Sequence, residues 1–356
     1  AYCCWPGNRG RNGSTRPTLC PSGERRRCRE APHGPVIAIG RPDEDLPPLG
    51  AARVYTAGSD WRDPAVFWNE EENLYWMLIA ARTHSDYGRN GCVGLCVSSD
   101  LKTWQARPPL YAPNVYSSAL ECADLFQMGD WWYLVYSTYT DRFATHYRLS
   151  RSARGPWLAP PEDSFDGRAF YAAKTASDGV RRYAFGWNPT RSENHFNWNP
   201  PGYAGCDFNT WDWGGTMIVH KLIQNPDGTL YVTPPTAVDN AFPCENELKL
   251  QPLVGDWKLS EKEAQVNSPC GYSSLLMNKV PECCKLEMDV CFDDAPREFG
   301  IALQVDNDFS LGYYLIFEPN RNRVQYKTGL RMYEDGGKMF PYEVEQERPF
   351  DFEKGK

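Results

Sequence analysis

Two short acidic motifs stand at corresponding places in the sequence. The first is Trp61–Pro64, with the letters WRDP, and the second is Glu121–Asp124, with the letters ECAD. If Asp63 and Glu121 meet in an enclosed pocket, they suit cleavage of a glycosidic bond. One carboxylic acid protonates the leaving oxygen, while another carboxylate stabilises or attacks the oxocarbenium-like carbon. Crowding of carboxylates also raises the pKa of one of them, which keeps a proton available for transfer.

The elements that would position these carboxylates recur along the chain as units of short strands. One unit runs from Asp63 to Trp104 and the next from Glu121 to Trp157, while a weaker third begins at Phe170. Three or four short strands over roughly 40 to 60 residues are typical of a propeller blade. The first strands of blades line the central axis, so equivalent residues converge there. A β-sandwich would not explain why an acid opens and a tryptophan closes the first two units.

The composition supports an all-β fold. Aromatic residues make up 14% of the 356 residues, and 29 Gly and 29 Pro are interleaved with them, which disfavours long helices. Tryptophan-rich surfaces also suit sugars, whose C–H faces pack on aromatic rings. The net charge of −8 argues against nucleic acid or an anionic membrane as a partner. No segment approaches the ~18 to 20 apolar residues of a membrane span.

We predict three regions of different character. Residues 1–50 contain eight Arg and no Lys, and this atypical Arg- and Cys-rich segment is expected to be disordered or non-native, as a truncated or frame-shifted start would be. Residues 51–240 are predicted to form the β-propeller, with the last blade around Trp211–His220. Residues 241–356 are predicted to form an incomplete β-sandwich, with strands at Lys285–Val290 and Tyr313–Phe317.

The cysteines and histidines predict no metal site or other cofactor. The chain has 13 Cys and five His, but no CxxC pairs at zinc-finger spacing. An odd number of cysteines without a secretory signal favours reduced thiols and a cytoplasmic protein.

The two acidic motifs resemble the RDP and EC motifs of glycoside hydrolase family 32, the invertases, inulinases and levanases. Phe170–Ala173 resembles the family's FYA segment, Gly186–Trp187 its GW, and Trp213–Gly215 its WxG. The resemblance implies a five-bladed β-propeller followed by a β-sandwich. It also implies a retaining mechanism on β-fructofuranosides, with sucrose, a fructo-oligosaccharide or fructan as substrate and no cofactor.

The resemblance also implies roles for individual residues. Glu121 would be the general acid/base, and Asp63 would hold fructosyl hydroxyls and stabilise the transition state. Arg62 would anchor the sugar or a carboxylate, and Cys122 would lie beside the acid and tune its pKa.

Three further residues are candidates for substrate contacts. Trp61 and Trp187 would provide aromatic walls. Asp124 has two interpretations, because it could bind substrate or cap a blade turn.

One departure from the family pattern concerns the nucleophile, an Asp in an Asn-Asp-Pro motif upstream of RDP. No Asn-Asp-Pro occurs here, and the aspartates before Asp60 are Asp43 and Asp45. We therefore expect the first blade to be missing or incomplete and the chain to be truncated at both ends. One alternative is a non-catalytic fructan- or glycan-binding propeller that has lost its nucleophile. Another is a related five-bladed arabinosidase or xylosidase, against which the paired RDP and EC motifs argue.

We predict that this chain has lost all or nearly all of its release of fructose from sucrose, because retaining hydrolysis needs a covalent nucleophile. The measurement is fructose release from sucrose by the purified chain. Robust cleavage would refute the prediction.

Overall fold

The computed structural model describes most of the chain after residue 60. The described residues are 55, 60–83, 90–113, 117–140, 144–167, 170–190, 212–260, 263–268, 271–277, 280–281, 283–305, 312–329 and 342–352. The segment 1–50, predicted to be disordered or non-native, lies outside the described residues.

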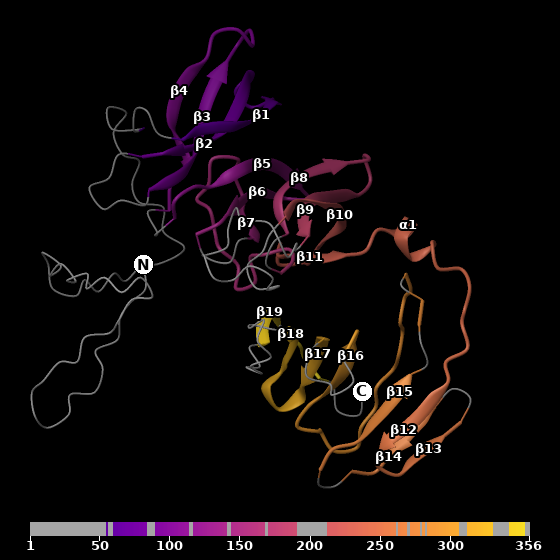
Figure 1. Ribbon diagram of the computed structural model, residues 1–356. Helices are drawn as coiled ribbons and strands as arrows, with labels where there is room; N and C mark the ends of the chain where they lie inside the picture. Colours follow the sequence, from indigo (N-terminus) through magenta and orange to yellow (C-terminus); the bar gives the residue numbers. More distant parts are fainter. Residues whose placement is uncertain are drawn as a thin grey trace, which may run out of the picture. The chain divides into compact units, whose positions relative to one another are not determined.

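Three antiparallel sheets follow one another along the chain (Figure 1). The first, in the order β1-β2-β3-β4, contains β1 (Trp61–Asn69), β2 (Leu74–Arg82), β3 (Gly91–Ser98) and β4 (Gln105–Tyr111). The second, β5-β6-β7, contains β5 (Glu121–Met128), β6 (Trp131–Thr138) and β7 (Ala144–Ser150). The third, β8-β9-β10-β11, contains β8 (Tyr171–Ser177), β9 (Arg182–Thr190), β10 (Asp212–Gln224) and β11 (Leu230–Thr233). Strands adjacent in sequence pair in every sheet, as they do in propeller blades.

Local sequence explains where these strands begin and end. Runs of aromatic and β-branched residues such as Trp131–Thr138 favour strands. The turns between them use residues that tolerate a left-handed backbone, with φ 53° at Asn73 and φ 57° at Gly129. The strands expected in the first two units are confirmed.

The third unit and the expected last blade form a single sheet. Strand β10 pairs with β9, placing Met217 opposite Trp187 and Leu222 opposite Arg182. The prediction of a separate blade around Trp211–His220 is therefore wrong for the described residues 212–220. A strand pattern shows that a strand exists, but its pairing partner depends on contacts across a long connection.

Two hydrophobic clusters join the three sheets face to face. Trp76, Leu95 and Leu125 belong to the cluster shared by the first and second sheets. Phe126, Tyr147 and Leu222 belong to the cluster shared by the second and third. Each cluster takes alternate residues from neighbouring strands, so each sheet buries both of its faces only when it has a neighbour on either side.

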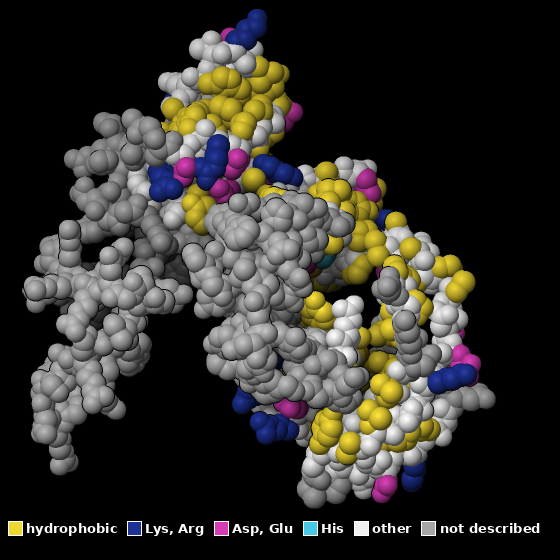
Figure 2. Space-filling model, viewed as in Figure 1, with side chains coloured by type: hydrophobic (Ala, Val, Ile, Leu, Met, Phe, Trp, Pro, Cys, Tyr) yellow, Lys and Arg dark blue, Asp and Glu magenta, His cyan; other side chains and the backbone are white. Residues whose placement is uncertain are grey.

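Part of the β1–β4 sheet carries exposed apolar side chains, and Figure 2 shows hydrophobic side chains over its visible face. Val66 is 48% exposed and Trp68 is 38% exposed. Trp68 packs against Tyr75 of β2 with a ring distance of 4.8 Å.

The C-terminal region is also built from sheets. Its strands are β12 (Leu250–Val254), β13 (Trp257–Leu259), β14 (Ala264–Val266), β15 (Ser274–Met277), β16 (Phe299–Leu303), β17 (Gly312–Glu318), β18 (Arg323–Gly329) and β19 (Tyr342–Pro349). Strands β12 and β15 pair, β13 and β14 pair, and β16 to β19 form a four-stranded meander. Phe299 of β16 stacks on Phe317 of β17, with ring centroids 4.9 Å apart.

The expected all-β fold, with propeller-like sheets followed by C-terminal sheets, is confirmed. Short helical turns occur at α1 (Thr236–Asp239) and at Pro319–Arg321. The strand predicted within Tyr313–Phe317 lies in β17, whereas Lys285–Val290 is not a strand, so that prediction is wrong. Five blades, the missing first blade and the incomplete sandwich stay predictions. In the described part of the chain, no helix is long and apolar enough to cross a membrane.

We predict that Leu134→Ala lowers the free energy of unfolding by about 2 to 5 kcal/mol, because it leaves a cavity in a packed core. Leu134 of β6 is fully buried in the cluster between the first two sheets. The measurement is urea unfolding of both proteins. Leu158→Ala is the control, since Leu158 is 41% exposed, and equal losses in the two variants would contradict this account of the core.

Candidate active site

The first strands of the three sheets share one backbone irregularity. The pairing register shifts between Arg62 and Ala65 in β1, between Glu121 and Asp124 in β5, and between Tyr171 and Lys174 in β8. At each shift the residue after Arg62, Glu121 or Tyr171 has a left-handed backbone, with φ values of 58° at Asp63, 53° at Cys122 and 53° at Ala172. A bulge bends a strand and re-aims its side chains. Arg62, Glu121 and Tyr171 therefore occupy equivalent positions in successive sheets.

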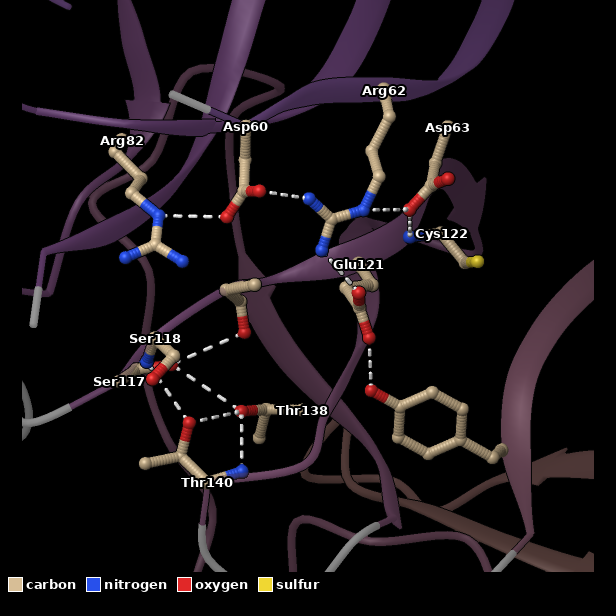
Figure 3. Close-up of polar contacts among 12 residues, drawn as sticks. Asp60, Arg62, Asp63, Arg82, Ser117, Ser118, Glu121, Cys122, Thr138 and Thr140 are labelled. Carbon is tan, nitrogen blue, oxygen red and sulfur yellow. Dashed lines mark hydrogen bonds and ion pairs between the residues drawn. The ribbon is translucent and has the colours of Figure 1, made fainter. Parts of the chain in front are cut away.

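These three equivalent side chains form one continuous chain of hydrogen bonds, and Figure 3 shows Arg62 and Glu121 within it. Nη2 of Arg62 donates to Oε1 of Glu121, and the Tyr171 hydroxyl donates to Oε2 of the same carboxylate. Both oxygens of Glu121 are thus held, one from the first sheet and one from the third. The Glu121 side chain is 15% exposed, so it still has access to solvent.

Asp63 lies beside Arg62 and next to the backbone of Cys122 (Figure 3). Its Oδ2 accepts a hydrogen bond of 3.3 Å from the backbone N–H of Cys122 and lies 3.8 Å from Nε of Arg62. Figure 3 shows the second Asp63 oxygen pointing away from Cys122. Asp63 thus bridges the two predicted motifs, and Asp is one of the residue types that tolerate its left-handed backbone.

Arg62 has a further carboxylate partner. Its Nη1 pairs with Oδ1 of Asp60, and Oδ2 of Asp60 accepts from Nε of Arg82 at 2.7 Å. Burial lowers the pKa of Arg62, but its hydrogen bonds to Glu121 and Asp60 outweigh burial and raise that pKa. Burial raises the pKa of Asp60, and its hydrogen bonds to Arg82 and Arg62 outweigh this and hold the pKa below its usual value.

The chain segment that leads into β5 is fixed before it reaches Glu121. The N–H of Gly91 donates to the carbonyl of Ser117 at 2.9 Å. The N–H of Ser118 donates to Oγ1 of Thr140 at 2.9 Å (Figure 3). A Cβ on Gly91 would lie 2.8 Å from the backbone of Ala119. Glycine at this position therefore allows the first sheet to approach the start of β5.

A buried phenol, that of Tyr171, and a partly buried thiol, that of Cys122, lie next to Glu121. Burial and the hydrogen bond to Glu121 raise the pKa of Tyr171, so the phenol stays protonated as a donor. Burial raises the pKa of the Cys122 thiol to about 11, and the charge of Asp63 adds to the rise. Cys122 is therefore a neutral thiol near pH 7.

The three other residues predicted to contact substrate, Trp61, Trp187 and Asp124, have different surroundings. Trp61 is 48% exposed and meets Tyr55 edge-on, with ring centroids 5.0 Å apart. Trp187 of β9 is the register partner of Tyr171. Oδ2 of Asp124 accepts hydrogen bonds of 2.7 Å from both the N–H and the hydroxyl of Thr175, which join β5 to β8. Substrate contacts by these residues stay predictions.

The structure also brings together residues that the sequence motifs missed. Tyr171 lies in the segment that resembles FYA, and its place at the opening of the third repeat was the available signal. Asp60 and Arg82 had no such signal, because their contact depends on the antiparallel pairing of β1 and β2.

The cluster thus combines the fixed carboxyl group of Glu121, which can transfer a proton, with the carboxylate of Asp63 and the guanidinium of Arg62, which contacts both. No three His, Cys, Asp or Glu side chains are arranged to hold a metal ion in the described ranges. A hollow of about 450 Å³ lined by Met128, Arg182 and Lys221 lies at the opposite ends of the strands from Glu121, so it takes no part in this chemistry.

Blade-like sheets whose first strands converge on a carboxylate cluster define the class as a β-propeller protein. Residues 47–231 match the N-terminal domain of glycosyl hydrolases family 32. The match covers more than half of the sequence, and the chain belongs to this family.

Curated relatives agree with this membership. A levanbiose-producing levanase of Bacillus subtilis (strain 168) is 26% identical over 225 residues, covering 56% of this chain and 40% of the relative. A sucrose-6-phosphate hydrolase of Escherichia coli is 24% identical over 235 residues, covering 58% of this chain and 46% of the relative. The matched region spans about half the length of these relatives or less.

Among solved structures, a GH32 β-fructofuranosidase of Bombyx mori aligns with a TM-score of 0.46 and 16% identity, covering 75% of this chain and 52% of that one. A sucrose-6-phosphate hydrolase of Lactobacillus gasseri aligns with a TM-score of 0.47 and 15% identity, covering 81% and 56%.

We predict that Asp63→Asn lowers the pKa of the Cys122 thiol. The substitution removes the negative charge that helps to raise this pKa but leaves the burial that contributes most. Asn also tolerates the left-handed backbone at this position. The measurement is the pH dependence of iodoacetamide labelling of the Cys122 peptide by mass spectrometry.

The matched control for this charge effect is Asp130→Asn, because the Asp130 side chain is 93% exposed in the β5–β6 turn. An unchanged labelling profile in Asp63→Asn, or the same change in both variants, would contradict the assigned contact.

Proposed function

We propose that this chain carries the acid/base and stabilising half of a retaining glycoside hydrolase site for β-fructofuranosidic bonds in sucrose or fructans. The observation that carries the proposal is the convergence of Arg62, Glu121 and Tyr171 from three successive first strands, with Asp63 beside them. Family membership and the names of the curated relatives, a levanase and a sucrose-6-phosphate hydrolase, support this substrate class.

In this proposal Glu121 protonates the glycosidic oxygen as the bond to the fructosyl carbon breaks. It then removes a proton from the water that hydrolyses the intermediate. Arg62 and Tyr171 hold the two carboxyl oxygens in place. Asp63 accepts hydrogen bonds from fructosyl hydroxyls, which strengthen as positive charge develops on the sugar ring.

The covalent step needs a further carboxylate as nucleophile. Asp60, the other carboxylate of the cluster, is engaged by Arg62 and by Arg82 and is not assigned this role. The sequence lacks the Asn-Asp-Pro that would supply the nucleophile, so the activity we expect of this chain alone is binding of the β-fructofuranosyl group. The same observation favours a second candidate function, a fructan-binding propeller.

The organisation that we propose keeps the boundaries expected from the sequence. Residues 51–240 form the catalytic propeller and residues 241–356 a β-sandwich, and residues 1–50 are the atypical Arg- and Cys-rich segment. We also propose a cytoplasmic location, which is supported by free thiols at all seven described cysteines: Cys92, Cys96, Cys122, Cys244, Cys283, Cys284 and Cys291.

We predict that Asp63→Asn weakens binding of sucrose or levanbiose about tenfold, since a hydrogen bond to a charged group contributes about 1.5 kcal/mol. In this proposal Glu121 donates a proton to the glycosidic oxygen, whereas Asp63 holds the fructosyl hydroxyls, and the amide of Gln can still donate a hydrogen bond. We therefore expect Glu121→Gln to change the affinity less. The measurement is isothermal titration calorimetry with the purified chain, and exposed Glu70→Gln and Asp130→Asn are the matched controls.

The outcomes test the proposal against its alternatives. Binding that depends on Asp63, without turnover, supports the proposed half-site and the binding propeller alike. Turnover with inversion at the anomeric carbon would support an arabinosidase- or xylosidase-like enzyme instead. Failure of every β-fructofuranoside to bind, or binding unaffected by Asp63→Asn, would contradict the proposal.

A further inference from the structure

The Arg62 guanidinium lies among three carboxylates. Nη1 meets Asp60, Nη2 meets Glu121, and Nε lies 3.8 Å from Oδ2 of Asp63. A guanidinium is planar, so the contact that one edge makes sets the direction of the other nitrogens. With its nitrogens engaged in this way, Arg62 is placed to orient Glu121 rather than to grip a substrate anion.

Asp60 in turn is held from the neighbouring strand. It lies directly before β1, and Arg82 is the last residue of β2, so the antiparallel pairing of these strands brings the two residues together. Nε of Arg82 pairs with Oδ2 of Asp60 at 2.7 Å, and Asp60 presents its Oδ1 to Arg62. The Asp60 and Arg82 side chains are 22% and 28% exposed, so solvent screens this pair only in part.

The backbone at Arg82 is held by strand pairing on both sides. Arg82 pairs with Gly91 of β3, and the adjacent Ala81 pairs with Trp61 of β1. Arg82 is thus fixed between two strands, whereas the Arg62 side chain crosses from the first sheet to the second. Figure 3 shows Arg82, Asp60, Arg62 and Glu121 in that order, with charges of alternating sign.

We propose that Asp60 and Arg82 are positioning residues that lock the Arg62 guanidinium in the orientation that meets Glu121. Arg82 acts on Glu121 only through Asp60 and Arg62. Loss of Arg82 leaves Asp60 with Arg62 as its remaining partner in the cluster, so Asp60 can move with the guanidinium and draw it away from Glu121. Loss of Asp60 breaks the link directly, and a loss of both then has no larger effect than the loss of Asp60 alone.

The direct test observes Arg62 itself in the whole chain by NMR of ¹⁵N-labelled arginine side chains. The Arg62 signal is identified by its disappearance in Arg62→Lys. We expect restricted rotation and slow hydrogen exchange of this guanidinium in the parent chain. Both properties should be lost in Asp60→Asn and in Arg82→Gln, and partly kept in Arg82→Lys, whose ammonium can still pair with Asp60.

The matched control is Arg107→Gln, because Arg107 is an exposed arginine of β4 in the same sheet. An Arg62 signal that is unchanged by Arg82→Gln would overturn the proposal. Equal loss of the signal in Arg107→Gln would also overturn it, since general loosening of the sheet would then explain the change.

A second readout rests on the proposed function. Asp60→Asn and Arg82→Gln should each weaken sugar binding several-fold, and the double variant should match Asp60→Asn rather than multiply the two losses. Additive losses would contradict coupling through Asp60. If the parent chain binds no β-fructofuranoside, the proposed function fails, while the Arg62 signal still decides whether Asp60 and Arg82 are positioning residues.

Discussion

The ion pair between Arg62 and Glu121 is the interaction on which the site depends, because it joins the first strands of two different sheets. It forms only if both strands are bulged at the same level, and each strand has a left-handed residue directly after the paired side chain. Such backbone conformations cost free energy for residues other than glycine, so surrounding contacts must stabilise them. The hydrophobic clusters between the sheets provide that support.

Supports for Glu121 reach it from both neighbouring sheets. On one side, Arg82 and Asp60 hold Arg62. On the other side, the Tyr171 hydroxyl contacts the carboxylate directly. Asp124, at the end of the β5 bulge, accepts a hydrogen bond from Thr175 and so joins β5 to β8. The same hydrogen bonds therefore hold the sheets together and orient the acid, which links the stability of the fold to the geometry of the site.

Much of this arrangement was predictable from local patterns. Aromatic and β-branched runs between turn residues located the strands of the first two sheets, and the acid at the start of each unit located Asp63 and Glu121. The predictions that were wrong concerned strand pairing, which depends on residues far apart in the sequence. Lys285–Val290 has an alternating pattern but no strand, and the third unit merges with the strand that contains His220. Alternation records which faces are apolar, whereas pairing depends on a partner elsewhere in the chain.

The sequence by itself determined the all-β class, the repeating units and the identity of the two acidic motifs, because these follow from residue type and short spacing. Only the tertiary structure decided that Tyr171, Asp60 and Arg82 belong to the same cluster. Tyr171 comes from a third sheet, and Asp60 meets Arg82 through the register of a strand pair. The first contact depends on convergence of the first strands of different sheets and the second on the pairing of two strands in one sheet, and no local pattern along the chain encodes the distances involved.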